Sequence, residues 1–162
     1  MPEDVVRALG FLCLGTRLRR IGERLQADTD AILATKELAI NASHYPYLAS
    51  LDRLGSMTLG DLAEAVGVSQ PGATRAVNQL IGQGLLKAEA SLQDRRCKIV
   101  DLTDEGRQLV EAGKSEVWPR IEAAVADLCR DLRGPLLQQL AELEDGLAEA
   151  SLARRTEGRS ER

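Results

Sequence analysis

Two short amphipathic segments joined by Gly67-Val68-Ser69 constrain the fold of this chain more than any other feature. The first segment opens at Thr58-Leu-Gly-Asp61, a variant of the capping box that begins many helices. The second opens at Ser69, a favourable N-cap residue, and tolerates Pro71 because proline fits the first turn of a helix. Gly67 ends the first segment, and Gly82 and Gly84 end the second. The pattern predicts a helix-turn-helix.

Apolar spacing assigns an inner face to each predicted helix. The first inner face comprises Leu59, Leu62, Ala63 and Val66, and the second comprises Ala73, Ala76, Val77, Leu80 and Ile81. The outer face of the second helix then carries side chains suited to base edges and phosphates, namely Gln70, Pro71, Thr74, Arg75 and Asn78. Packed helices with a glycine turn also occur in proteins that never bind DNA. This pattern alone leaves both interpretations open.

A basic hairpin follows directly. Residues 85–90 and 98–102 have the composition of short strands, and the polar stretch 91–97 separates them. Arg95 and Arg96 would lie at the tip, where a wing reaches a minor groove or flanking phosphates. Alternatively, Asp94 initiates a solvated turn and the arginines keep an edge ribbon soluble. The hairpin directly follows the second helix, which we call the reader helix because its outer face would contact the DNA bases. This position favours the wing, and the elements together predict a winged helix.

Composition indicates the fold class. Aromatic residues make up only 2% of the chain, so Leu, Ala, Val and Ile must fill the core, and these side chains suit packed helices. We therefore expect a mainly α fold with a small β-hairpin wing. The net charge is −4, yet residues 69–98 hold five basic residues against two acidic ones. Because local charge neutralises phosphates, the acidic total is compatible with DNA binding.

Helical patterns flank the winged helix on both sides. Residues 5–33 read as one long helix with two apolar stripes, and a short helix follows between Asn41, its expected N-cap, and Gly55. Thr103 caps a further long helix. Gly134-Pro135 breaks that helix, and residues 136–147 begin another. Trp118 lies in this long helix, where we expect it to serve packing only.

The ordered set of motifs resembles the MarR family of regulators over about residues 58–109. The resemblance is carried by Leu59-Gly-Asp-Leu-Ala-Glu-Ala-Val-Gly-Val-Ser-Gln-Pro-Gly-Ala-Thr-Arg75, Leu80, Gly84-Leu85-Leu86, Asp94-Arg95-Arg96 and Leu102-Thr103-Asp104-Glu105-Gly106. It implies a homodimer that reads a pseudo-palindromic site in double-stranded DNA. It also implies that Ser69 caps the reader helix, Thr74 and Arg75 face the groove, and Arg96 enters the minor groove with Asp94 holding the wing.

The same resemblance implies how the chain is divided. Residues 1–162 would form one subunit, with the winged helix-turn-helix at 36–109, dimerisation helices at 1–35 and 110–153, and a disordered tail at 154–162. The expected function is a sequence-specific DNA-binding repressor, released by a small ligand or an oxidant. The alternative is a winged helix that docks protein, as partner or antagonist of another regulator. The basic wing and the lack of aromatic anchors disfavour it.

Catalysis finds no support in the motifs. The sequence has no phosphate-binding glycine loop, no metal-ligand cluster and no triad spacing around its one histidine, so we expect no catalytic residue, metal or cofactor. Cys13, Cys97 and Cys129 are odd in number and far apart, which argues against a disulfide framework. The apolar run 8–14 is too short to span a bilayer, and acidic residues precede it. We expect a cytoplasmic protein.

Two hypotheses concern the release signal. Cys13 resembles in position the reactive cysteine of the peroxide-sensing branch of the family, whose tyrosine partners are replaced here by Arg17 and His44. A nearby cation would favour the reactive thiolate, but the preferred interpretation of Cys13 is a small core residue on an apolar stripe. Alternatively, a cavity for a small-molecule effector lies between the dimerisation helices and the winged helix-turn-helix, lined by His44, Tyr45 and Tyr47. These three side chains could equally fill the core.

Overall fold

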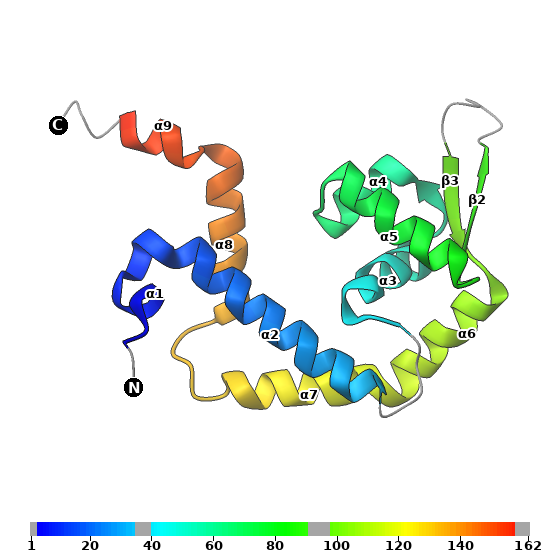
Figure 1. The fold of residues 1–162 in the computed structure, drawn as a ribbon, viewed down its shortest axis with the longest axis horizontal. Helices are drawn as coiled ribbons and strands as arrows, with labels where there is room; N and C mark the ends of the chain where they lie inside the picture. The colour runs from blue at the N-terminus through cyan, green and yellow to red at the C-terminus, as the bar shows by residue number, and fades with distance from the viewer. Residues whose placement is uncertain (1–2, 35–39, 91–97, 158–162) are drawn as a thin grey trace. The chain divides into compact units, whose positions relative to one another are not determined.

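The computed structural model describes residues 3–34, 40–90 and 98–157. The chain divides into two compact units, Met1–Glu122 and Ala123–Arg162 (Figure 1). The first unit holds the predicted winged helix, and the second is helical. The described residues are mostly helical with one small sheet, which confirms the expected fold class.

The N-terminal helix is broken, so the prediction of one helix over residues 5–33 is wrong. The segment comprises α1 (Val5–Ala8), the 3-10 turn η1 (Gly10–Cys13) and α2 (Leu14–Ala34). Gly10 adopts a left-handed φ of 55°, a conformation that glycine reaches without a Cβ clash and that interrupts helical hydrogen bonding. The Arg20 guanidinium then bonds the Asp4 carboxylate at 2.9 Å, which ties α1 to α2 and lowers the pKa of Asp4.

The second helical stretch begins with a 3-10 turn. It comprises η2 (Ala42–His44) and α3 (Tyr45–Leu54), which ends at Gly55 with a φ of 83°. Asn41 occupies the predicted N-cap position, but its side chain makes no capping hydrogen bond. The Asp30 carboxylate on α2 instead accepts the Ala42 N–H at 2.5 Å.

The helix-turn-helix forms as predicted from α4 (Leu59–Val66) and α5 (Gln70–Gly82). The Thr58 hydroxyl oxygen accepts the Asp61 N–H at 3.1 Å, and the Ser69 hydroxyl oxygen accepts the Gly72 N–H at 3.3 Å. Gly67 joins the helices in a left-handed conformation. One assignment is wrong, because Ile81 is 37% exposed rather than on the inner face. At 100° per residue, Ile81 lies beyond Val77 at the margin of the buried stripe.

The hairpin is confirmed, and a third strand joins it. Strands β2 (Leu86–Ala90) and β3 (Lys98–Leu102) pair antiparallel, with Leu86 opposite Leu102. The short β1 (Met57–Thr58) pairs with the other edge of β3, which gives the order β1-β3-β2. Two residues are too few to show strand periodicity, so the sequence did not predict β1.

One hydrophobic core joins these elements. Its fully buried side chains come from α2, α3, α4, α5, the sheet and the helices that follow: Leu33, Leu48, Leu51, Leu62, Leu80, Leu102, Val100, Val110 and Val117. The predicted Thr103 cap of α6 (Asp104–Ala112) is present, since its oxygen accepts the Gly106 N–H at 3.0 Å. The Thr103 hydroxyl also donates to the Gly84 carbonyl at 2.6 Å. These contacts fix α6 against the end of the reader helix.

The C-terminal helices begin within the first unit. After α6, one π-helical turn, η3 (Gly113–Val117), leads into α7 (Trp118–Cys129). The second unit contains α8 (Leu136–Glu149) and α9 (Leu152–Glu157). The expected disordered tail is therefore wrong over residues 154–157, because the Ser151 hydroxyl oxygen accepts the Arg154 N–H at 3.3 Å and begins α9. The Arg155 guanidinium also donates to the Ala150 carbonyl at 3.0 Å. Residues 158–162 lie outside the described part.

We predict that Gly106→Ala destabilises the first unit by about 1–3 kcal/mol, the range typical of an overpacked site. A methyl group there would collide with the Leu85 carbonyl oxygen, which is backbone and cannot swing away. Urea unfolding measures the change. Gly82→Ala is the matched control, because a Cβ at Gly82 meets nothing within 4 Å. Equal stability of Gly106→Ala and the parent would contradict this packing.

Candidate nucleic-acid interface

The outer face of α5 is available for contacts. We call Gln70, Pro71, Thr74, Arg75 and Asn78 the reader face; all are exposed except Thr74, which is half-buried. The Thr74 hydroxyl donates to the Gln70 carbonyl at 2.8 Å, so its oxygen can still accept a hydrogen bond and its methyl group can make an apolar contact. Within the described residues, neither Arg75 nor Asn78 forms an ion pair or side-chain hydrogen bond. Both polar groups are therefore free to bind a ligand.

Charges of both signs lie near α5, and Arg75 and Lys98 are cations without an ion pair among the described residues. The Asp61 carboxylate, on the preceding helix, accepts a hydrogen bond from the Thr58 hydroxyl at 2.7 Å. Lys87 on β2 lies 3.6 Å from Glu89, whereas Lys98 at the start of β3, beside the tip end of the hairpin, is exposed and has no acidic partner among the described residues. The N-terminus of α5 adds the positive end of the helix dipole.

The predicted wing tip lies outside the described residues. Asp94, Arg95 and Arg96 belong to this stretch, so their proposed roles stay predictions. The structure does set where the ribbon leaves the sheet, because Ala90 pairs with Lys98 at the last rung of β2 and β3.

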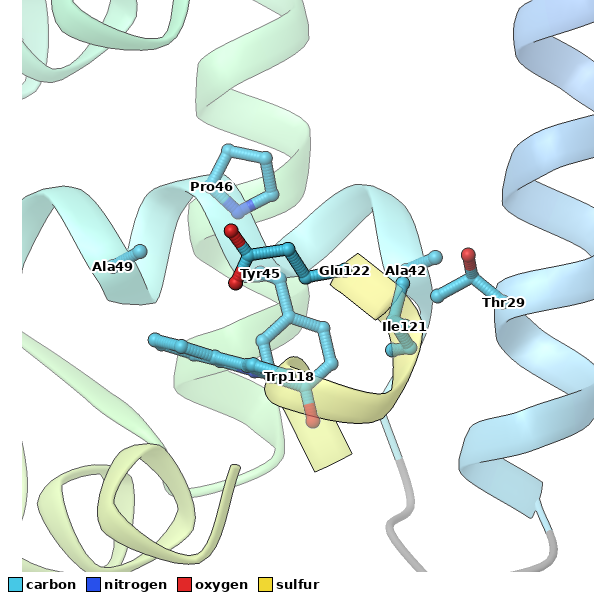
Figure 2. A pocket seen from close by; sticks show the side chains of 8 residues that line it. All are labelled: Thr29, Ala42, Tyr45, Pro46, Ala49, Trp118, Ile121 and Glu122. Atoms are coloured by element: carbon cyan, nitrogen blue, oxygen red, sulfur yellow. The ribbon is translucent and has the colours of Figure 1, made fainter. Parts of the chain in front are cut away.

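A pocket of about 420 Å³ lies beside the core of the first unit (Figure 2). It is almost entirely apolar, and its walls come from α2, η2, α3 and α7. The lining residues are Thr29, Ala42, Tyr45, Pro46, Ala49, Trp118, Ile121 and Glu122. A concave apolar site with a few polar groups is the usual form of a small-molecule pocket.

Two aromatic rings shape one wall of this pocket. Tyr45 and Trp118 meet edge to face, with ring centroids 5.5 Å apart and planes at 82°. Burial raises the pKa of Tyr45, and the neighbouring Trp118 indole N–H partly offsets this. Neither the Tyr45 hydroxyl nor the Trp118 indole N–H meets hydrogen-bond geometry with a described partner. Glu122 is the one charged lining residue; it is exposed and has no ion pair in the described part of the chain.

The residues considered for sensing are not brought together. Cys13 ends η1 and Arg17 follows on α2, whereas His44 and Tyr47 are buried in the core. At 1.5 Å of rise per residue, Cys13 lies about 25 Å along α2 from Asp30, the residue that contacts η2. His44 and Tyr47 do not line the pocket, and of the predicted aromatic cluster only Tyr45 does.

Of the lining residues, sequence reasoning named only Tyr45 and missed the others, Trp118 and Glu122 among them. Trp118 is the single tryptophan of an aromatic-poor chain, and that rarity was the one available signal. Its indole packs over Gly113 of the π turn, where an added Cβ would stand 2.8 Å from the indole nitrogen. The turn shifts the helical register at this point, so the position of Trp118 does not follow from regular periodicity.

Comparison with known proteins gives concordant matches. The family model described as "MarR family" matches residues 40–98. The transcriptional repressor CouR, solved bound to a 23-mer DNA duplex, is 30% identical with a TM-score of 0.69, covering 81% of this chain and 92% of that chain. The Mycobacterium tuberculosis transcriptional regulator MOSR, solved with DNA, is 22% identical with a TM-score of 0.70, covering 86% and 99%. Bordetella bronchiseptica BpsR, whose DNA binding is regulated by 6-hydroxynicotinic acid, is 22% identical with a TM-score of 0.64, covering 85% and 94%.

We predict that Gly113→Ala displaces the Trp118 indole, because the new methyl group would overlap the ring. The fluorescence of this single tryptophan should shift to longer wavelength as the ring gains water, with a loss of about 1–3 kcal/mol in stability. Gly22→Ala on α2 is the control, since a Cβ there meets nothing within 4 Å. An unchanged spectrum in Gly113→Ala would contradict the described ring position.

Proposed function

The chain belongs to the MarR family of transcriptional regulators, and from that premise we propose that it binds DNA through α5. It is a DNA-binding regulator and not an enzyme. The observation that carries the proposed binding surface is the reader face, where Arg75 is exposed and free of partners among the described residues while the opposite side of α5 is buried.

The chemistry of the reader face suggests a role for each side chain in the major groove. Arg75 suits the paired acceptors of guanine, and the Asn78 amide suits adenine. Thr74 offers its methyl group to thymine, or its hydroxyl oxygen to a base amino group, because its proton is donated to the Gln70 carbonyl. The first turn, with Ser69, Gln70 and Pro71, would approach a phosphate. We further propose that Arg95 and Arg96 reach a minor groove or phosphates from the wing, with Asp94 holding its turn.

Exposed apolar side chains support a homodimer. Phe11 is 94% and Leu12 82% exposed in the first unit, and Leu137 is 82% exposed in the second. Large apolar side chains left in water within one subunit are typical of surfaces that associate. We propose that residues 1–35 and 110–153 form the dimer contacts and that residues 36–109 read DNA. A two-fold dimer would place two reader helices one DNA turn, about 34 Å, apart on a pseudo-palindromic site.

We propose that the bound dimer represses transcription. A compact dimer bound across a promoter would block it, and the 30% identical relative CouR is a repressor. Among the described residues, no helix combines the length and apolar character that crossing a membrane requires. We propose that the protein acts in the cytoplasm, where a regulator meets its DNA.

We propose that the pocket beside Tyr45 and Trp118 is the effector site. Its apolar walls fit a small flat molecule, and the Glu122 carboxylate favours a cationic or hydrogen-bond-donating group over a second carboxylate. Oxidation of Cys13 is the competing release signal. We prefer a ligand as the release signal because His44, a proposed partner of Cys13, lies far from Cys13 within one subunit.

We predict that Arg75→Ala weakens specific DNA binding by about 1–3 kcal/mol if Arg75 reads a base. The experiment locates the bound site by footprinting DNA upstream of the gene, and then measures anisotropy on that site and on random DNA across a salt series. Arg19→Ala is the control, because this exposed arginine of α2 lies beside Glu23 and outside the reader face. Binding by Arg75→Ala equal to that of the parent would remove Arg75 from the interface, and no DNA binding by the parent would favour a protein-docking role.

We predict that the parent binds 2-phenylethylamine more tightly than 3-phenylpropionate, and that Glu122→Gln reduces this preference by about two- to fivefold, the effect of one exposed charge. Trp118 fluorescence and calorimetry measure both. Glu64→Gln, an exposed carboxylate of α4 outside the pocket, is the control. An equal preference in parent and Glu122→Gln would contradict the proposed ligand class. Release from DNA by hydroperoxide that Cys13→Ser abolishes would make an oxidant the effector.

A further inference from the structure

The short turn η2 holds two helices at once. At its start, the Ala42 N–H donates to the Asp30 carboxylate on α2 at 2.5 Å. At its end, His44 Nε2 lies 3.1 Å from Gln79 Oε1 on α5. Three residues therefore bridge the long N-terminal helix and the reader helix.

The bond between His44 and Gln79 is well placed to position α5. His44 is only 5% exposed, and its Nδ1 has no hydrogen-bond partner among the described residues. Among those residues, Gln79 is therefore the one hydrogen-bond partner of the His44 side chain. Gln79 is exposed, adjacent to Asn78 and one helical turn beyond Arg75. A change at this bond therefore acts on the turn of α5 that carries two members of the reader face.

The effector pocket adjoins both anchors of η2. Thr29, which precedes Asp30, and Ala42 line the pocket from α2 and η2 and face each other in Figure 2. Tyr45, which follows His44, lines it from α3. A molecule seated between Thr29 and Ala42 would push against the residues next to the Asp30 and His44 contacts.

We propose that η2 relays occupancy of the pocket to the reader helix, with His44 and Gln79 as the positioning pair. This rests on the proposed role of the pocket as the effector site. An occupant that separates η2 from α2 strains or breaks the His44–Gln79 bond and lets α5 leave its DNA-competent position. One net hydrogen bond is weak enough to break reversibly, and its loss changes an equilibrium by about two- to twelvefold.

A double-mutant cycle tests the relay without a known effector. Thr29→Phe places a ring in the pocket as a built-in occupant, and Gln79→Leu removes the acceptor from His44. We expect Thr29→Phe to lower DNA affinity by about two- to twelvefold in the parent, the effect of losing one hydrogen bond. In the Gln79→Leu background the same change should lower affinity by less than about twofold, because the relay is already cut.

Two further variants make the cycle specific. Gln79→Glu keeps an acceptor for His44 and should restore the full effect of Thr29→Phe, whatever the added charge does to the overall affinity. Gln83→Leu, an exposed amide just after α5 with no side-chain bond to His44, should leave the effect unchanged. If Thr29→Phe does not fold, Ala49→Phe fills the same pocket from α3. An equal effect of the occupant in the parent and Gln79→Leu backgrounds overturns the relay.

Hydrogen exchange separates failure of the relay from failure of the proposed function. The amides of α5 should exchange faster in Thr29→Phe than in the parent, and Gln79→Leu should remove that difference, with no DNA present. If the parent does not bind DNA, the proposed function is wrong, while the exchange result still decides the relay. Unchanged exchange in α5 would overturn the relay even where DNA binding is confirmed.

Discussion

The structure depends on burial of the inner side of α5. Ala73, Val77 and Leu80 are buried in the same core as Leu62 of α4 and Leu48 of α3. Because interiors are packed as tightly as crystals, this contact allows α5 one orientation about its own axis. That orientation decides which residues face outward, and so Arg75 and Asn78 form a surface while Ala76 does not. The binding chemistry is a consequence of the packing on the opposite side of the same helix.

The elements that support the reader helix also build the pocket. η2 and α3 contribute one wall, and α7 contributes Trp118 after the π turn at Gly113. The segment Ala42–Leu54, the residues of η2 and α3, thus lines the proposed effector pocket and also packs against the helices that support the proposed DNA-reading face. An occupant larger than the pocket would displace these walls, because the core behind them is closely packed. The proposed relay depends on this shared segment.

Local interactions explain where prediction from sequence succeeded. The caps at Thr58, Ser69 and Thr103 each bond an amide three residues ahead, so the interacting pair lies within a single turn of chain. The predictions that failed concern elements whose structure depends on contacts that no local sequence pattern shows. Gly10 breaks a stretch whose apolar stripes fit one helix, and β1 exists only because β3 supplies a partner for two residues. Residues 154–157 are polar, yet they lie in α9, and the Arg155 guanidinium donates to the carbonyls of Gly146 in α8 and of Ala150 just after it.

The helix-turn-helix, its caps, the hairpin that follows and the polar face of the reader helix could all be predicted from the sequence, because they depend on periodicity and on contacts within one turn. The pocket and the contact of His44 with α5 could not be predicted, because they arise from packing between distant segments. His44 and Gln79 are 35 residues apart, and Tyr45 meets Trp118 across a still longer separation. Such pairs form when distant elements share one core, and their geometry is set by the packing of the whole unit rather than by any segment of the chain.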